Sequence, residues 1–162
     1  MKTLIAALFT VVALQAMPAH AATVADATSP LVGRWALDVE HLPMPPQARP
    51  KSVTVEFRDP GAGQWSTHVE IIHRDGSRMH ADSTLPLDGT PGKVAGNYWA
   101  DVAAVKMPAP NVLVVQLVDH GAPASTRAYS VTGDNDTLTE TKAFFTKDGT
   151  PVLQTTVFKR VK

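Results

Sequence analysis

The chain has 162 residues, and its 15 lysines and arginines are balanced by 15 aspartates and glutamates, so the formal net charge is zero. A balanced charge gives no electrostatic footprint for nucleic acid or for an anionic lipid surface. The sequence holds no cysteine, which excludes disulfides, thiol nucleophiles and thiolate metal sites.

The first 21 residues are typical of a secretory signal peptide. Lys2 supplies the positive start, an apolar run extends from Leu4 to Leu14, and Ala19-His20-Ala21 forms a small-x-small cleavage site. The apolar run is too short to span a bilayer comfortably, and no cysteine follows the cleavage point to carry a lipid anchor. We therefore expect an exported, soluble protein of the periplasm or the extracellular space, with no membrane span once the signal peptide is removed.

Residues 22–30 are small and polar and predict a flexible leader. From Leu31 onward apolar and polar residues alternate, which is the period of strands with one buried face. Asp-Gly pairs and similar turn sequences separate successive runs, as in antiparallel hairpins. These runs predict strands at 31–39, 51–59, 64–74, 77–85, 93–99, 101–107, 112–119, 125–131, 137–146 and 152–161.

Short hairpins in chain order favour an all-β fold over residues 31–162, a single antiparallel up-and-down β-barrel of eight to ten strands. Closure of the sheet leaves no unpaired strand edge. The connection from Glu40 to Pro50 contains four prolines and interrupts the regular spacing. We expect it to form an extended flap or a single helical turn across one mouth of the barrel. An outer-membrane barrel is disfavoured, because the chain lacks aromatic girdles and ends in Lys162.

The segment Gly33-Arg34-Trp35 resembles the Gly-x-Trp signature that opens the first strand of lipocalins and related calycin barrels. The resemblance implies that Trp35 closes the base of the barrel beneath a basic residue of the last strand. Here that residue is Arg160, or Lys159 if the register slips. The layout also resembles small exported bacterial proteins with a lipocalin-like or fatty-acid-binding-protein-like barrel. Gly33, Trp35 and Arg160 are structural in this interpretation, since a guanidinium can stack on an indole and bond nearby carbonyls.

The segment Arg127-Ala128-Tyr129 resembles the Arg-x-Tyr pair with which fatty-acid-binding barrels hold a carboxylate. Side chains two residues apart on one strand point the same way. Inside a barrel an unpaired arginine is costly, so an inward-facing Arg127 would anchor an anionic headgroup. The alternative is an outward-facing arginine beside a packed tyrosine.

The predicted last strand has two mixed faces, so its core side stays open. If the Arg160 face points inward, Gln154 and Thr156 line the lumen. Gln116 and Tyr129 would face the same space. The candidate ligand-binding residues are therefore Arg127, Tyr129, Gln116, Gln154 and Thr156.

Four histidines, His68, His73, His80 and His120, lie on or beside neighbouring strands. They lack a third ligand at a recognisable spacing, so we expect no metal site. The aromatic cluster Asn97-Tyr98-Trp99 is interpreted as core or rim packing. No nucleophile elbow, phosphate loop or dinucleotide fingerprint occurs, and we predict neither catalytic residues nor a cofactor.

Two functions from different classes stay open. The first is an exported barrel that binds a small, partly apolar ligand of lipophilic or amphipathic character. The second is a protein-interaction module, an inhibitor or assembly factor, with a packed lumen and a functional outer surface. An enzymatic function would need a perturbed acid–base pair in a cavity, and the sequence indicates none.

Overall fold

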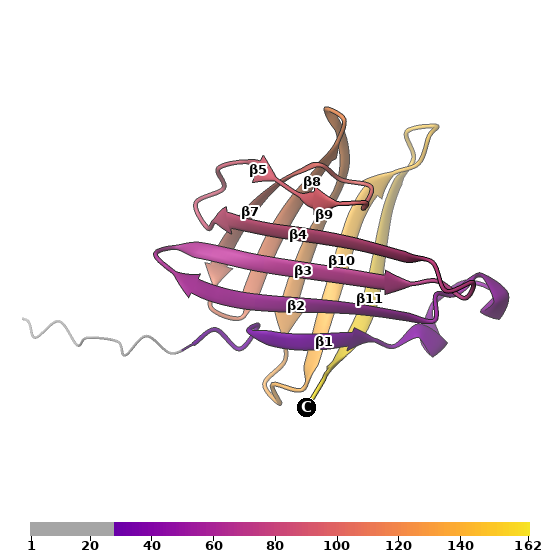
Figure 1. The fold of residues 1–162 in the computed structure, drawn as a ribbon, viewed down its shortest axis with the longest axis horizontal. Coiled ribbons are helices and arrows are strands. Elements are labelled where there is room, and N and C mark those ends of the chain that lie inside the picture. Colours follow the sequence, from indigo (N-terminus) through magenta and orange to yellow (C-terminus); the bar gives the residue numbers. More distant parts are fainter. Residues whose placement is uncertain (1–27) are drawn as a thin grey trace, which may run out of the picture.

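Antiparallel strands make up almost all the regular structure of residues 28–162, the part of the chain that the computed structural model describes (Figure 1). No helix in this part is long and apolar enough to span a membrane. Two 3-10 turns, η1 (Val39–His41) and η2 (Pro46–Ala48), lie between the first two strands. The strands are β1 (Gly33–Leu37), β2 (Ser52–Gly61), β3 (Gln64–Ile72), β4 (Arg78–Pro86), β5 (Gly92–Lys93), β6 (Ala95–Gly96), β7 (Val102–Ala109), β8 (Val112–Asp119), β9 (Ala122–Val131), β10 (Thr137–Phe145) and β11 (Pro151–Arg160).

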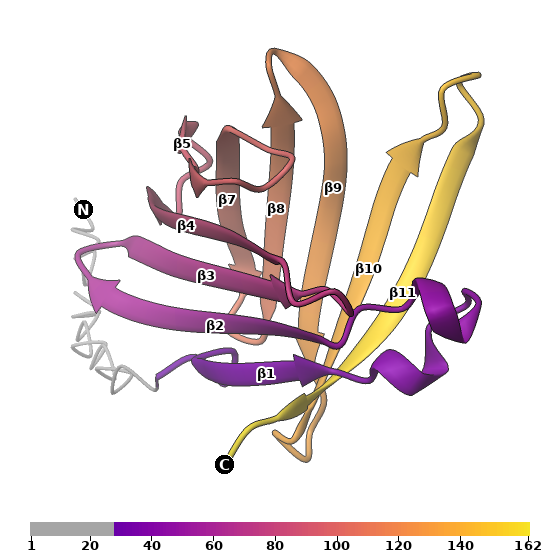
Figure 2. The ribbon, with the colours of Figure 1, turned by 45° about the vertical axis from the view of Figure 1, so that its right-hand side comes forward.

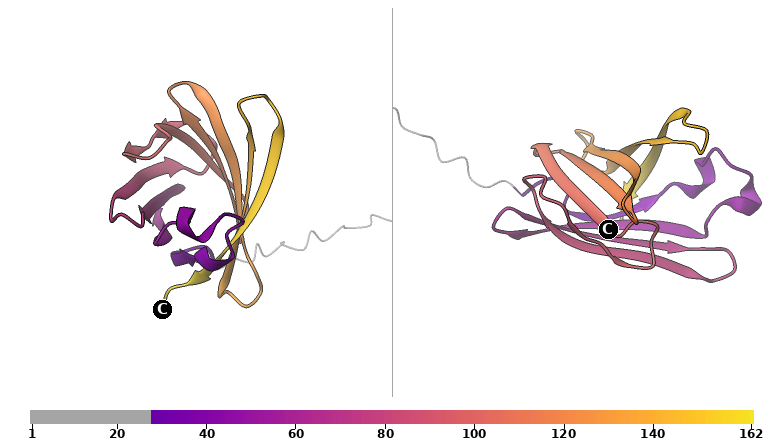
Figure 3. Two further views of the ribbon diagram at one scale, coloured as in Figure 1. Left: turned by 90° about the vertical axis from the view of Figure 1, so that its right-hand side faces the viewer. Right: turned by 90° about the horizontal axis from the view of Figure 1, so that it is seen from above.

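The strands form one sheet in the order β5-β7-β8-β9-β10-β11-β1-β2-β3-β4-β6. Because β1 pairs with β2 on one side and with β11 on the other, the first and last strands lie side by side (Figure 2). The group β1–β4 crosses the group β7–β11 steeply, so the two groups face each other across the interior (Figure 3). The prediction of one antiparallel barrel is confirmed at this level, and the barrel is nearly closed.

The remaining seam lies between β4 and β7. The short strand β5 pairs with β7, and β6 pairs with β4, so residues 92–96 connect the two edges. The prediction of one continuous strand over 93–99 is therefore wrong, and the sheet has eleven strands rather than eight to ten. Gly96 has a φ of 119°, which bends the chain out of β6, and the Asn97 side chain then bonds the backbone of β4.

Large apolar side chains fill the half of the barrel that contains Trp35. Trp35, Phe57 and Trp65 are buried there, and the rings of Phe57 and Trp65 lie 5.7 Å apart. On β8 the alternate residues Leu113, Val115 and Leu117 point inward, as the two-residue period of a strand requires. This packing stabilises the fold in the absence of disulfides, and it leaves the opposite half of the lumen partly open.

At the base, Arg160 is the cross-strand neighbour of Trp35, and its guanidinium carbon lies 4.0 Å from the centre of the indole ring. Its nitrogens donate hydrogen bonds to three carbonyl oxygens, of Val32 (2.9 Å), Pro30 (2.7 Å) and Asn135 (2.6 Å). Gly33 is required here, since its φ is 129° and a Cβ would lie 2.6 Å from the Arg160 Nη1.

Lys159, the alternative partner of Trp35, donates instead to Thr137 Oγ1 on the exposed side of the sheet. The predicted signal peptide, residues 1–21, lies outside the described residues. The predicted leader ends at residue 30, but Ser29 is already buried and donates a hydrogen bond to the Pro110 carbonyl at 2.6 Å. The contacts of the barrel therefore begin at least two residues before Leu31.

Candidate ligand-binding cavity

A cavity of about 270 Å³ opens at the mouth of the barrel, between two walls of different character. One wall is apolar and is formed by β1–β3 together with the proline-rich connection. The other wall is polar and is formed by β9–β11. The apolar wall consists of Leu37, Leu42, Met44, Ala48, Pro50, Val53, Val55, Val69 and Ile71, with His73 at its end directly after β3, and the polar wall of Arg127, Tyr129, Glu140, Lys142, Gln154 and Thr156.

The proline-rich connection borders this cavity, as expected from its place in the sequence. It forms the two short turns η1 and η2 rather than one, and each ends where a proline follows within a few residues. Tyr98 and Trp99 complete the rim, with ring centres 4.2 Å apart. Trp99 is half-exposed, so the interpretation of this aromatic pair as packing at the rim agrees with its position.

The lower part of the polar wall is a row of three side chains on adjacent strands. Glu140 is the cross-strand neighbour of both Tyr129 and Thr156. The Tyr129 hydroxyl donates to Glu140 Oε1 at 2.7 Å, and the Thr156 hydroxyl donates to Oε2 at 3.0 Å. Arg127 Nη1 donates a third bond to Oε1 at 3.0 Å and forms an ion pair with the carboxylate. The buried Glu140 is thereby both neutralised and hydrogen-bonded, as a buried carboxylate must be.

Burial and the neighbouring groups together set the protonation states around Glu140. Burial raises the pKa of Tyr129 well above the usual 10.0, and the neighbouring Glu140 carboxylate adds to the effect. Burial alone would lower the pKa of Arg127, but Tyr129, Tyr98 and Glu140 together outweigh it and raise that pKa. Tyr129 therefore stays a phenol and Arg127 stays a cation at neutral pH, so both act as hydrogen-bond donors in the cavity.

The upper part of the polar wall is a second row, in which Lys142 lies between Arg127 and Gln154 on the adjacent strands. The Lys142 ammonium is half-buried and lies 4.7 Å from the centre of the Phe144 ring. Burial, followed by the charge of Arg127, lowers the pKa of Lys142. Within residues 28–162, Glu140 forms its ion pair with Arg127, and Lys142 takes part in no ion pair.

Four of the five candidate residues from the sequence line this cavity, namely Arg127, Tyr129, Gln154 and Thr156. They do so because the Arg160 face of β11 points inward, which answers the question left open by its mixed faces. Whether these residues bind a ligand stays a prediction. The outward-facing alternative for Arg127 is wrong, because its guanidinium is buried against Glu140.

Gln116 is the exception and does not line the cavity. On β8 it lies between Val115 and Leu117, whose side chains occupy the interior, so Gln116 points to the outer face. Its amide accepts a hydrogen bond from the Thr126 hydroxyl at 2.6 Å and donates to the Ser125 carbonyl at 3.3 Å.

Sequence reasoning missed Glu140 and Lys142, which carry most of the charge in the cavity. Both share the inner face of β10 with the buried Leu138. The alternation of residues 138, 140 and 142 was the available signal, but it does not show that these residues are the cross-strand neighbours of Tyr129 and Arg127.

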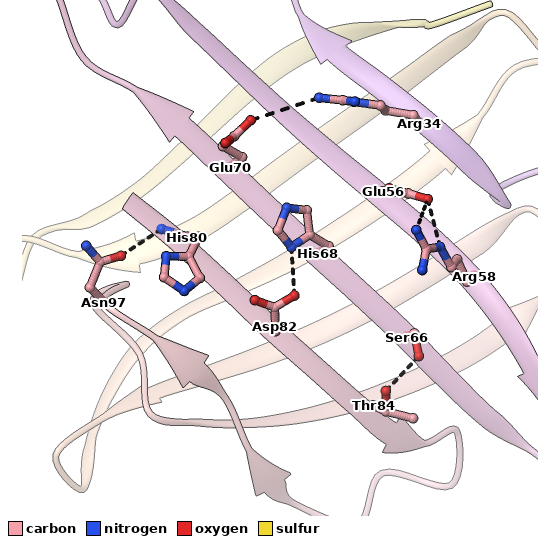
Figure 4. A network of polar contacts seen from close by, with 10 residues as sticks. All are labelled: Arg34, Glu56, Arg58, Ser66, His68, Glu70, His80, Asp82, Thr84 and Asn97. Atoms are coloured by element: carbon pink, nitrogen blue, oxygen red, sulfur yellow. Dashed lines mark hydrogen bonds and ion pairs between the residues drawn. The ribbon is translucent and has the colours of Figure 1, made fainter. Parts of the chain in front are cut away.

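Two of the four histidines, His68 and His80, lie on the outer face of β3 and β4 (Figure 4). His73, directly after β3, lines the cavity, and His120 is exposed in the turn after β8. His68 Nδ1 lies 2.7 Å from Asp82 Oδ1, and Glu70 binds Arg78 at 3.0 Å. Within residues 28–162, no group of three or more histidine and acidic side chains is arranged to hold a metal ion. Exposed pairs of this kind contribute little to stability, so we interpret them as a polar solvent-facing surface.

No protein-family model matches this chain, and no curated protein matches it significantly. The all-β barrel is consistent with a calycin-like architecture at the level of the fold. One fold serves many functions, so the residues of the cavity, and not the barrel alone, indicate what this protein does.

Proposed function

We propose that this protein is an exported lipocalin-like barrel that binds a small, partly apolar ligand in the cavity between β1–β3 and β9–β11. The observation that carries the proposal is the open space of about 270 Å³ with one apolar and one polar wall. Ligand sites are mostly apolar concavities with a few polar groups, and they often lie in the mouths of β-barrels. Their volumes begin at about 300 Å³, so this cavity suits a compact molecule.

The first test uses N-phenyl-1-naphthylamine, an uncharged probe whose fluorescence rises in apolar surroundings. Val69 lines the cavity, so Val69→Phe should fill part of it and weaken binding of the probe by about tenfold, or 1.4 kcal/mol. Val157→Phe is the matched control, because Val157 lies on the outer face of β11 and is 38% exposed. Titration of each folded protein gives the affinity. The proposal is wrong if the wild-type protein does not bind the probe, or if both substitutions weaken binding equally.

A second candidate function, a protein-interaction module, is favoured by one apolar area on the outer face of the β10–β11 hairpin. Phe145 is 73% exposed and Leu153 is 77% exposed, and their cross-strand partners are Pro151 and Ala143. Exposed apolar patches often mark interaction sites. The double substitution Phe145→Ser and Leu153→Ser should leave probe binding unchanged. If light scattering shows that it abolishes an assembly formed by the wild-type protein, this second function gains support.

A further inference from the structure

Two rows of polar side chains cross the cavity wall, and they differ in how well their charges are satisfied. The lower row, Tyr129, Glu140 and Thr156, is bonded internally. The upper row, Arg127, Lys142 and Gln154, consists entirely of side chains that can donate hydrogen bonds. From this difference, and resting on the proposed function, we propose that the ligand is a compact amphipathic organic anion whose single acidic group binds along the upper row, with Lys142 as its main charge partner.

The charge balance of the wall favours an anion. The one carboxylate of the cavity, Glu140, lies 3.0 Å from Arg127 and neutralises it. Lys142 then leaves one net positive charge on this half-buried wall, and His73 on the opposite wall contributes no negative charge to offset it. A charge that is partly removed from water is unfavourable unless it is paired. A carboxylate, sulfonate or phosphate of the ligand supplies the missing counter-charge.

The geometry of the upper row suits an acceptor with several oxygens. Cross-strand neighbours on one face have Cβ atoms about 5 Å apart, so donors from three adjacent strands converge on one area. Arg127 Nη1 binds Glu140, Nε contacts Ser125 at 3.5 Å, and the guanidinium carbon lies 5.8 Å from the centre of the Tyr98 ring. The Gln154 amide makes no hydrogen bond to residues 28–162, so it can donate to the oxygens that Lys142 attracts. Bonds from the charged Lys142 and Arg127 to such oxygens belong to the stronger, charge-assisted class.

The opposite wall limits the rest of the ligand. Val53, Val69 and Ile71 line the opposite wall and offer no hydrogen-bonding side-chain atoms, and the His73 imidazole, two residues beyond Ile71, is the titratable group of that wall. A ligand in this space has an apolar body against β2 and β3 and an acidic group against β9–β11. The polar groups run along one whole wall rather than capping the end of a long tunnel, which favours a compact ring system over an extended chain.

Two probes with one ring system separate charge from shape. 8-Anilinonaphthalene-1-sulfonate carries a sulfonate on the skeleton of N-phenyl-1-naphthylamine, which is neutral. Wild-type protein should bind the sulfonate more tightly. Lys142→Met should weaken binding of the sulfonate about tenfold, and by at least about fivefold more than it weakens binding of the neutral probe, since a tenfold change corresponds to the 1.4 kcal/mol expected of a modest charge pair. Lys159→Met is the control, because it removes the same charge from the exposed side of β11.

The outcomes distinguish this inference from the proposed function. Binding of the neutral probe with no selective effect of Lys142→Met would overturn the anionic class and leave the binding barrel standing. Failure of both probes to bind the folded protein would overturn both proposals. Competition of the neutral probe with the sulfonate, together with an unchanged thermal melt of each variant, establishes that one cavity is measured. Sulfonate binding that the neutral probe does not displace would also contradict the inference.

Discussion

Three carbonyl oxygens and one indole ring hold the guanidinium of Arg160 at the base of the barrel. Substitution of Arg160 by Met removes the three bonds and the stack, and we expect it to lower the free energy of unfolding by about 2 kcal/mol. Arg160→Lys should recover only a minor part, because an ammonium cannot present the planar fork that reaches several carbonyls. Unfolding in urea measures both changes.

The control for this prediction is Arg34→Met. Arg34 is a half-exposed arginine of β1 whose nearest carboxylate, on Glu70, lies 4.0 Å away. Surface pairs of this kind contribute about 0–1 kcal/mol, so Arg34→Met should be nearly neutral. Equal losses at positions 34 and 160 would show that the base of the barrel does not depend on the Arg160 contacts.

Glu140 is the residue whose loss should cost the most stability among those of the cavity. Glu140→Gln leaves the buried Arg127 without its counter-charge, and removal of one partner from a buried pair costs about 3–5 kcal/mol. Arg127→Met leaves the carboxylate unpaired and should cost a similar amount. The double variant carries neither charge, so it should be more stable than the sum of the single effects predicts by at least about 1 kcal/mol. Additive losses in urea unfolding would contradict a coupled pair.

At the scale of elements, the turn between β9 and β10 connects the cavity wall to the base of the barrel. Asp134 Oδ1 accepts hydrogen bonds from the Thr132 hydroxyl (2.5 Å) and from the backbone N–H groups of Asp136 (3.0 Å) and Thr137 (3.2 Å). This network holds Asn135 at a φ of 57°, and the Asn135 carbonyl in turn accepts from Arg160. Through the Asn135 carbonyl, Asp134 therefore helps to position the Arg160 guanidinium over the Trp35 ring.

We expect Asp134→Ala to lower Tm by about 3 °C, a shift of the size that loss of a few turn hydrogen bonds produces in a domain of this length. Asp136→Ala is the control, because it removes the same charge two residues away and its side chain makes no hydrogen bond within residues 28–162. Thermal melts followed by circular dichroism compare the two variants. Equal effects would assign the loss to charge and not to the turn.

The same turn predicts a pH dependence with a definite sign. Hydrogen bonds, first that from Thr132, lower the pKa of Asp134 from 3.8 to about 2. A carboxyl whose pKa is lower in the folded state stabilises the fold above its unfolded value and loses that effect as the pH falls. The Tm difference between wild type and Asp134→Ala should therefore be constant above about pH 5 and shrink as the pH falls toward 2. A difference that grows on acidification would contradict this account.

Alternation in the sequence located most of the long strands, because one face of each is buried against the core. The predicted strand 112–119 coincides with β8, and 137–146 exceeds β10 by one residue. The prediction of one strand over 93–99 was wrong, because local alternation does not reveal that Gly92 and Gly96 allow the chain to connect the edge of β7 with the edge of β4. Pairing with distant strands, not local preference, determined its structure.

At the scale of the whole molecule, the dependence on pairing between distant strands also limits what the sequence alone can predict about the cavity. The inward direction of Arg127 and Tyr129 could be stated as a hypothesis from one strand, but their contact with Glu140 depends on the register across β9, β10 and β11. A slip of one residue would move Glu140 to the outer face. The stacking of Arg160 on Trp35 could be predicted only from a family resemblance, because these residues are distant in the sequence and become neighbours only in the closed sheet.

The near-closure of the sheet predicts where the molecule opens first. β4 and β7 have no ladder of their own, and they are connected through the two-residue strands β5 and β6 and an isolated bridge between Asp88 and Lys106. Strand edges with few hydrogen bonds open at low free energy. Amides of β4 and β7 that point toward this seam should exchange with deuterium at least about tenfold faster than amides of β8, which is paired on both sides. Hydrogen exchange followed by NMR measures this ratio, and equal protection of β4, β7 and β8 would mean that the seam is as firmly closed as the rest of the barrel.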